Sequence, residues 1–164
     1  MNARYVRYYQ NAAKQGMEGT ELTDLPWLSA CEIEVYAQVP VVTESRNVAS
    51  HKPVTSGWGD NVQYWNNKNV PALATDGDTS SAVGTTYHMD GRGGDISGTP
   101  GKPEDMYITI DLGQDYPIEK IVYYGEFAAS NTWMPQHVVI RAATTADFSA
   151  AVTVFNNDAH HLRV

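Results

Sequence analysis

Met-Tyr-Ile-Thr-Ile-Asp-Leu at residues 106–112 is the clearest strand pattern in the chain. Its apolar side chains alternate with Tyr, Thr and Asp, which is the two-residue period of a strand with one buried face. Further segments rich in Val, Ile and Tyr lie at residues 3–9, 31–37, 118–124, 137–143 and 151–155. Several short strands separated by turn-forming segments predict an all-β antiparallel sandwich or barrel.

Local composition also predicts how these segments are arranged. In the strand at 31–37, Ile33 and Val35 are expected on one side, opposite the acidic Glu32 and Glu34. Gly, Pro and polar residues predict irregular chain at residues 10–29, 79–105 and 113–117. One more strand is expected near residues 47–50.

Length and charge limit the classes of partner. The 164 residues fit one domain that is large enough to bury a core. The formal net charge of −8 disfavours nucleic acid and anionic membranes, because both select basic surfaces. No apolar run approaches the roughly 18 residues of a spanning helix, so membrane insertion is not expected. Cys31 is the only cysteine and can form no internal disulfide. These features are compatible with a cation site and with neutral ligands.

An oxygen-rich loop reads Pro-Ala-Leu-Ala-Thr-Asp-Gly-Asp-Thr-Ser-Ser at residues 71–81. Gly77 permits a sharp bend that lets carboxylates and carbonyls converge on one point. Calcium takes about 6–8 oxygen ligands of these kinds. The loop is not an EF-hand, because no Glu follows at the required distance. Taken alone, the loop is better described as a polar turn between strands.

Three other pieces of sequence accompany the Asp-Gly-Asp loop. They are Ile-Thr-Ile-Asp-Leu-Gly at 108–113, Ala-Arg-Tyr-Val-Arg-Tyr-Tyr at 3–9 and Cys-Glu-Ile-Glu-Val-Tyr at 31–36. Together the four resemble the discoidin family, also called the coagulation-factor type C domain. That family includes the family 32 carbohydrate-binding modules and the fucose-binding lectins. The resemblance covers residues 3 to about 158 and implies a jelly-roll β-sandwich of the galactose-binding-domain type.

The order of the pieces differs from the family's order. The family begins with the counterpart of Asn-Val-Ala-Ser-His-Lys-Pro-Val at 47–54 and ends with the counterparts of the strands near 3–9 and 31–37. We therefore expect one circularly permuted domain. Residues 1–37 would hold the family's last strands, 38–46 a connector, and 47–164 the family's first and central part. The alternative is the tail of one domain followed by the body of the next, with strands exchanged between molecules.

The resemblance implies a structural calcium site. Its ligands would be the side chains of Asp76 and Glu32, the carbonyls of Leu73, Asp78 and Cys31, and the hydroxyl of Ser81 or Thr79. These positions supply at least six oxygens, a count that suits calcium. Otherwise Glu32 is an exposed strand residue beside Glu34, and the two carboxylates repel each other.

The resemblance also implies a sugar site on the loops near the calcium end. The matching positions are His88, Glu126, Asn131 and Trp27, with Arg92 and Trp133 as neighbours that could join them. Aromatic rings stack on the apolar face of a pyranose, while planar polar groups bond its hydroxyls. The family expects Arg where this chain has Glu126, and Arg92 could supply that guanidinium. Each of these residues is otherwise an ordinary loop, turn or core-capping residue.

No motif marks a catalytic pair, so the chain is not expected to be an enzyme. The resemblance implies a non-catalytic module that recognises a glycan or polysaccharide. It would belong to a larger secreted or cell-surface protein and hold an attached catalytic domain near its substrate. The alternative is a protein-interaction or adhesion module that uses the same loops. The phospholipid-binding branch of the family is disfavoured, because its apolar spikes with basic neighbours are absent from loops 10–29 and 82–105.

Overall fold

The computed structural model describes residues 1–10, 27–39, 42–57, 70–80, 87–90, 107–125 and 138–156, with only the backbone at 10, 27–29, 42–44 and 87–90. In order, its elements are β1 (Asn2–Gln10), β2 (Trp27–Ala30), β3 (Glu32–Val39), β4 (Val42–Asn47), β5 (Val54–Ser56), a short 3-10 helix η2 (Pro71–Thr75), β6 (Tyr87–Asp90), β7 (Tyr107–Tyr124), β8 (Val138–Ala143) and β9 (Val152–Asn156). The predicted all-β class is confirmed. None of the described residues forms a helix long and apolar enough to cross a bilayer.

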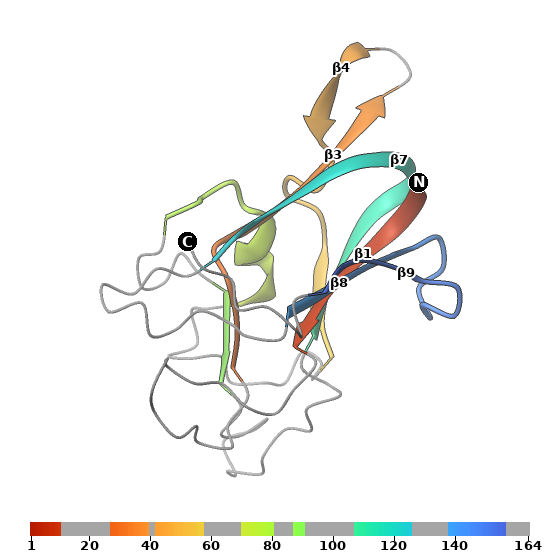
Figure 1. Ribbon diagram of the computed structural model, residues 1–164. Helices are drawn as coiled ribbons and strands as arrows, with labels where there is room; N and C mark the ends of the chain where they lie inside the picture. Colours follow the sequence, from red (N-terminus) through yellow and green to blue (C-terminus); the bar gives the residue numbers. More distant parts are fainter. Residues whose placement is uncertain are drawn as a thin grey trace.

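Seven strands form one antiparallel sheet in the order β4-β3-β7-β1-β8-β9, with β5 paired to β7 beside this path. β7 connects two parts of the sheet, because its first half pairs with β1 and β5 while its second half pairs with β3. In Figure 1, β7 arches over the molecule and the β3–β4 hairpin projects beyond it. β2 and β6 form a separate two-stranded sheet. This arrangement is consistent with a β-sandwich.

The bend in β7 lies where the sequence predicts a turn. Tyr5 pairs with Asp111 and Ala3 with Tyr116, so one β1 residue faces residues 112–115 of β7. This excess of residues on one strand is a bulge, which bends the strand. Gly113 supplies the required backbone conformation, with φ of +90°. Residues 113–117 therefore turn the chain without ending the strand, whereas two separate strands were predicted.

The core collects the apolar faces of both parts of the sheet. Ile33 and Val35 are buried on β3 while Glu34 is only half-buried, which confirms the predicted alternation. The buried cluster comprises Val6, Tyr8, Ala30, Ile33, Val35, Ala37, Val48, Ala49, Ala74, Ile108, Ile110, Leu112, Val138 and Ile140. Ala74 belongs to η2, so the oxygen-rich loop is anchored to the core. Glu32 departs from the pattern, because its exposed fraction is 0%.

Three segments differ from the sequence predictions. Residues 38–46, predicted as a connector, lie largely in the β3–β4 hairpin. The strand expected near 47–50 instead ends at Asn47, whose side-chain oxygen accepts hydrogen bonds from Val35 N and Ala49 N, both at 3.0 Å. β2 and β6 lie in segments predicted to be irregular, and they pair with each other. Cross-strand partners of this kind stabilise segments whose own propensity is weak.

Candidate metal centre

The oxygen-rich loop begins as η2, which starts at Pro71. Proline suits the first position of a helix, because the N–H that it lacks would have no partner there. Thr75 ends η2 as a buried residue, and its hydroxyl donates to Lys52 O at 3.0 Å. Thr75 O in turn accepts a hydrogen bond from His51 N at 2.6 Å. These bonds tie the start of the acidic turn to the segment that follows β4.

The turn itself is held by its own carboxylates. Gly77 has φ of +90°, a conformation that favours glycine. Asp78 N donates to Asp76 Oδ1 at 2.9 Å, and Ser80 N donates to Asp78 Oδ1 at 2.8 Å. The bonds from Ser80 lower the pKa of Asp78, because they favour the ionised carboxylate. The turn therefore carries closely spaced oxygens on a fixed backbone.

Glu32 lies against this turn from the first position of β3. Its Oε2 accepts a hydrogen bond from Gly77 N at 3.1 Å. Its Oε1 is buried and has no hydrogen-bond partner among the described residues. Burial, together with the nearby charges of Asp76 and Glu34, raises the pKa of Glu32 from its usual 4.5 to about 7. An ionised carboxylate in this position needs a positive partner.

Calcium would fit the described part of this site. A cation beside Oε1 would give that oxygen a partner and would offset the charges of Glu32 and Asp76. Within the described ranges, no three His, Cys, Asp or Glu side chains gather around one point. Further oxygens would therefore come from backbone carbonyls, from hydroxyls or from residues outside those ranges. Calcium accepts such mixed oxygen ligands.

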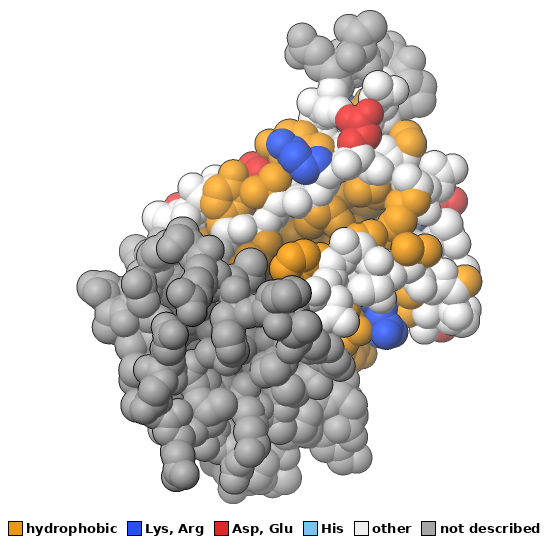
Figure 2. Space-filling model, in the orientation of Figure 1, with side chains coloured by type: hydrophobic (Ala, Val, Ile, Leu, Met, Phe, Trp, Pro, Cys, Tyr) orange, Lys and Arg blue, Asp and Glu red, His pale blue; other side chains and the backbone are white. Residues whose placement is uncertain are grey.

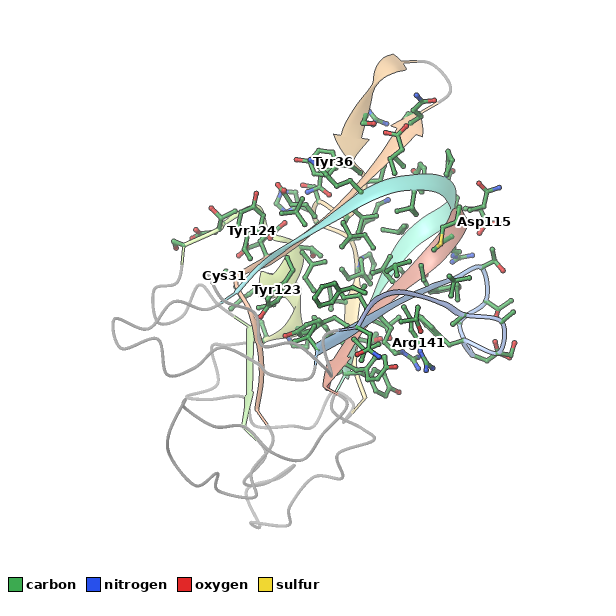
Figure 3. All side chains as sticks on the ribbon, viewed as in Figure 1. Cys31, Tyr36, Asp115, Tyr123, Tyr124 and Arg141 are labelled. Atoms are coloured by element: carbon green, nitrogen blue, oxygen red, sulfur yellow. The ribbon has the colours of Figure 1, made fainter. Side chains whose placement is uncertain are left out.

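The implied calcium ligands lie partly within the described chain. The hydrogen bond between Glu32 and Gly77 places the start of β3 beside the turn that carries Asp76 and Asp78. Leu73 is half-buried in η2 and packs against the core. Cys31 precedes Glu32, donating its backbone N–H to Tyr124 O at 2.8 Å and its thiol to Gly125 O at 3.2 Å. Figure 3 shows Cys31, Tyr123 and Tyr124 at the same end of the sheet. Ser81 lies outside the described residues.

Glu34 has partners that the sequence analysis did not identify. Its Oε2 accepts hydrogen bonds from the hydroxyls of Tyr36 at 3.3 Å and Tyr124 at 3.1 Å. Glu34 thus has donors of its own, whereas the second oxygen of Glu32 has none among the described residues. The contact between Glu34 and Tyr36 could have been predicted from the sequence, because residues two apart on a strand share a face. The contribution of Tyr124 depends on the pairing of β3 with β7.

Only two of the residues implied for sugar binding lie in the described chain. Trp27 begins β2, and His88 lies in β6. The ladder pairs Trp27 with Asp90 and Ser29 with His88. The backbone therefore places Trp27 and His88 diagonally across neighbouring strands. Arg92, Glu126, Asn131 and Trp133 lie outside the described residues.

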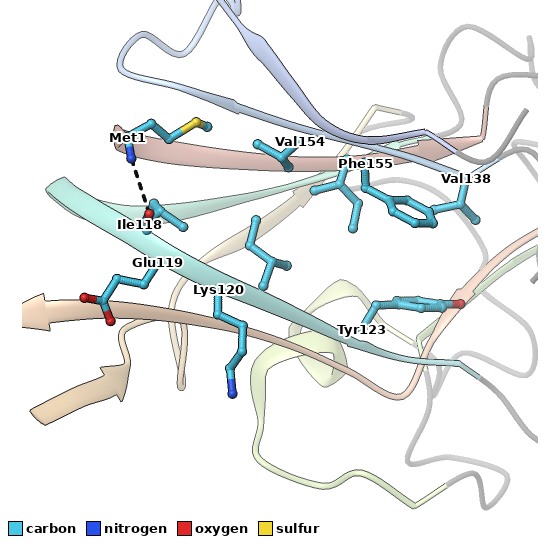
Figure 4. Close-up of a pocket in the computed structure, with 10 residues that line it drawn as sticks. Met1, Ile118, Glu119, Lys120, Tyr123, Val138, Val154 and Phe155 are labelled. Carbon is cyan, nitrogen blue, oxygen red and sulfur yellow. Dashed lines mark hydrogen bonds between the residues drawn. The ribbon is translucent and has the colours of Figure 1, made fainter.

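A separate apolar groove lies on the sheet between β7, β8 and β9. It has a volume of about 410 Å³ and is lined mainly by apolar side chains, including Ile118, Ile121, Tyr123, Val154 and Phe155 (Figure 4). Figure 2 shows hydrophobic side chains gathered over this face. None of the predicted calcium ligands that the structure describes lines the groove. The sequence analysis did not find it, because it forms where the bent β7 faces β8 and β9.

The described site thus consists of a buried carboxylate, an acidic turn with a left-handed glycine, and a nearby two-stranded ladder. Comparisons with known proteins found no relative of this chain. The chain matches no family model, no curated protein and no solved structure.

Proposed function

We propose that the chain is a calcium-stabilised, non-catalytic carbohydrate-binding module. The observation that carries this proposal is the buried Glu32 carboxylate, which has one oxygen without a partner among the described residues and Asp76 nearby. A buried carboxylate without a compensating partner costs stability, unless it is protonated or binds a cation. The adjacent turn offers the type of oxygens that calcium prefers.

The ion would be held by the side chains of Glu32 and Asp76, with Leu73, Asp78, Cys31 and Ser81 completing the shell. When bound, calcium supplies the positive charge that two neighbouring carboxylates need. Glu32 already fixes the turn through Gly77 N, which reduces the motion that binding must suppress. Because β3 and the turn come from distant parts of the sequence, the site would cross-link the fold.

Sugar recognition is supported by the resemblance and by the β2–β6 ladder. Trp27 would stack on the apolar face of a pyranose, and His88 would bond its hydroxyls. Asn131 with Glu126 or Arg92 would provide further polar contacts, and Trp133 would provide a second ring. Binding of this kind breaks no covalent bond. It would hold an attached enzyme of a secreted protein near a polysaccharide.

A single permuted jelly-roll domain is supported by pairing within one chain. β1 and β3, which match the last strands of the family, both pair with β7. The β3–β4 hairpin leads directly from the first part of the chain into the second. Light scattering tests this arrangement, since a monomer agrees with it and an obligate dimer favours strand exchange.

Calcium binding is tested by thermal melts in EDTA and in 5 mM CaCl₂ at about pH 7.5. We expect calcium to raise the melting temperature of the wild-type chain, because ligands of the folded state stabilise it. Glu32→Gln should abolish this increase. Glu34→Gln removes the same charge two residues away, where tyrosine hydroxyls are the partners, and should retain it. An identical melt with and without calcium would contradict the metal assignment.

The carbohydrate assignment needs a separate experiment. A glycan array probed with and without calcium should show binding to a defined set of sugars that depends on calcium. Trp27→Ala should remove that binding while leaving the calcium-dependent melt intact. If no glycan binds under either condition, the protein-interaction alternative is favoured.

A further inference from the structure

Two arginines are direct cross-strand neighbours on the side of the sheet opposite the core. Val6 and Tyr8 of β1 point into the core, with exposed fractions of 0% and 1%, so Arg7 between them lies on the opposite face. The antiparallel register pairs Arg7 of β1 directly with Arg141 of β8. Figure 3 shows Arg141 on the β8 side of the sheet, away from Cys31. This surface is therefore distinct from the candidate metal centre.

Aromatic rings fix the position of both guanidinium groups. The Arg7 Cζ atom lies 4.1 Å from the ring centre of Tyr107 and 3.9 Å from that of Phe148. The Arg7 Nε donates to Thr109 Oγ1 at 2.9 Å. Arg141 lies over the ring of Tyr9, at 5.3 Å. Held in this way, the two groups lose little further freedom when they bind a ligand.

Neither guanidinium has a carboxylate partner in the part of the chain that the structure describes. Arg4 on the same strand provides the contrast, because its Nε and Nη2 bond both oxygens of Asp111 at 2.8 and 3.0 Å. Like charges directly opposite each other destabilise a sheet. In agreement with this, burial and the nearby Arg141 charge lower the pKa of Arg7. An anion between the two groups would remove the repulsion.

We propose that Arg7 and Arg141 form a second binding site, which takes the carboxylate or sulfate substituent of an acidic saccharide. Guanidinium groups match the planar geometry of such oxyanions. The rings of Tyr9 and Tyr107, both half-buried, carry the guanidinium groups on their faces and so hold them in place for the ligand. The two arginines indicate that the bound group is an oxyanion. That this oxyanion belongs to a saccharide rests on the function proposed above.

The negative charge of the whole chain does not exclude an acidic ligand here. The Debye length is about 8 Å at physiological ionic strength, so distant carboxylates act weakly at this site. Asp111, the carboxylate across from Tyr5, is already paired with Arg4. Among the described residues, the local charge at the arginine pair is therefore positive, although the net charge of the chain is −8.

Isothermal titration calorimetry with trigalacturonate and with its fully methyl-esterified form tests the proposal. The two probes differ in charge and share the same sugar rings. We expect the acid to bind more tightly than the ester. Adding 0.5 M NaCl should weaken the binding of the acid and leave that of the ester unchanged. A sulfated galactose trisaccharide serves as a second arm that distinguishes sulfate from carboxylate preference. The proposal requires that at least one of the two acidic probes bind through its charge.

Variants locate the binding to the arginine pair. Arg141→Gln should weaken the preferred acidic probe about fivefold to tenfold, the size expected for a lost charge-assisted hydrogen bond. Lys120→Gln is the matched control, because Lys120 is also a cation over a ring, 4.2 Å from that of Tyr36, but lies on the β3 side of β7. The Lys120→Gln variant should bind the preferred acidic probe with unchanged affinity. Because Arg141 is exposed, the variant should fold, and a thermal melt verifies this.

Several outcomes would overturn the proposal. Equal affinity for the acid and the ester would show that the arginine pair does not recognise the charge of the ligand. An equal loss of affinity in both variants would show the same. If neutral sugars bind on the array and no acidic probe does, only this site fails. If no saccharide of any kind binds, the proposed function fails together with it.

Discussion

The protonation of Glu32 gives a sharp test of the candidate metal centre. In metal-free protein, burial and nearby carboxylates raise the pKa of Glu32 from 4.5 to about 7. A raised folded-state pKa means that the folded state holds its proton more tightly than the unfolded state. The resulting stability is fully present below pH 4.5 and is lost as the pH rises through about 7.

The expected size follows from this pKa shift. One pKa unit corresponds to about 1.4 kcal/mol, so the full titration changes the free energy of unfolding by about 3 kcal/mol. Most of this change falls between pH 5 and pH 8. For a domain of this length, each kcal/mol moves the melting temperature by about 2–4 °C. We therefore expect a decrease of roughly 5–10 °C across that range in EDTA.

Carboxylates with lowered pKa values act in the opposite direction but outside this range. Hydrogen bonds lower the pKa values of Asp78, Asp111 and Asp147, so their contribution is lost only as the pH falls below about 4. Glu32→Gln mimics the protonated side chain and should remove most of the slope between pH 5 and pH 8. Glu34→Gln should keep most of it.

The assay is a set of thermal melts followed by circular dichroism at half-unit pH steps, with EDTA and constant ionic strength. Calcium should reverse the trend, because its affinity increases as Glu32 ionises. A wild-type melting temperature that stays flat or increases between pH 5 and pH 8 in EDTA would refute the reasoning. An equal slope in Glu32→Gln would show that another group titrates.

Further expectations concern the fold. Ile110→Ala truncates a core side chain that is 1% exposed, so the free energy of unfolding in urea should decrease by about 2–5 kcal/mol. Val152→Ala, at a position that is 54% exposed, should change it little. Gly113→Ala forces an L side chain to φ of +90° and should cost about 1–2 kcal/mol in the same assay, although a Cβ would have room there. Asp111→Asn breaks a half-exposed ion pair with Arg4, so the melting temperature should decrease slightly in low salt and hardly at all in 1 M NaCl.

Much of the sheet could be predicted, because its strands carry the alternation of a half-buried surface. Ile33 and Val35 lie in the core as expected, and β1, β3, β8 and β9 lie within a residue or two of their predicted ranges. Alternation is a local signal, since each side chain on a strand faces the side opposite its neighbour's. The same signal gave the first and last parts of β7.

The remaining elements depend on partners that are distant in the sequence. β2 and β6 are four residues each and stabilise each other across a long separation, so neither is marked by its own composition. The bulge opposite Arg4 requires the register between β1 and β7. The partners of Glu34 likewise required the pairing of β3 with β7, which brings Tyr124 into range.

Strand periodicity and the acidic turn that carries Asp76 around Gly77 could be predicted from local sequence, because side-chain alternation and turn chemistry are properties of neighbouring residues. Glu32 became a candidate for a cation only through the family resemblance. The folded chain was needed to show that Glu32 is buried against Gly77 N with one oxygen lacking a partner among the described residues, and that Arg7 is the cross-strand neighbour of Arg141. Those relations arise from strand register and burial, which join residues that no local pattern connects.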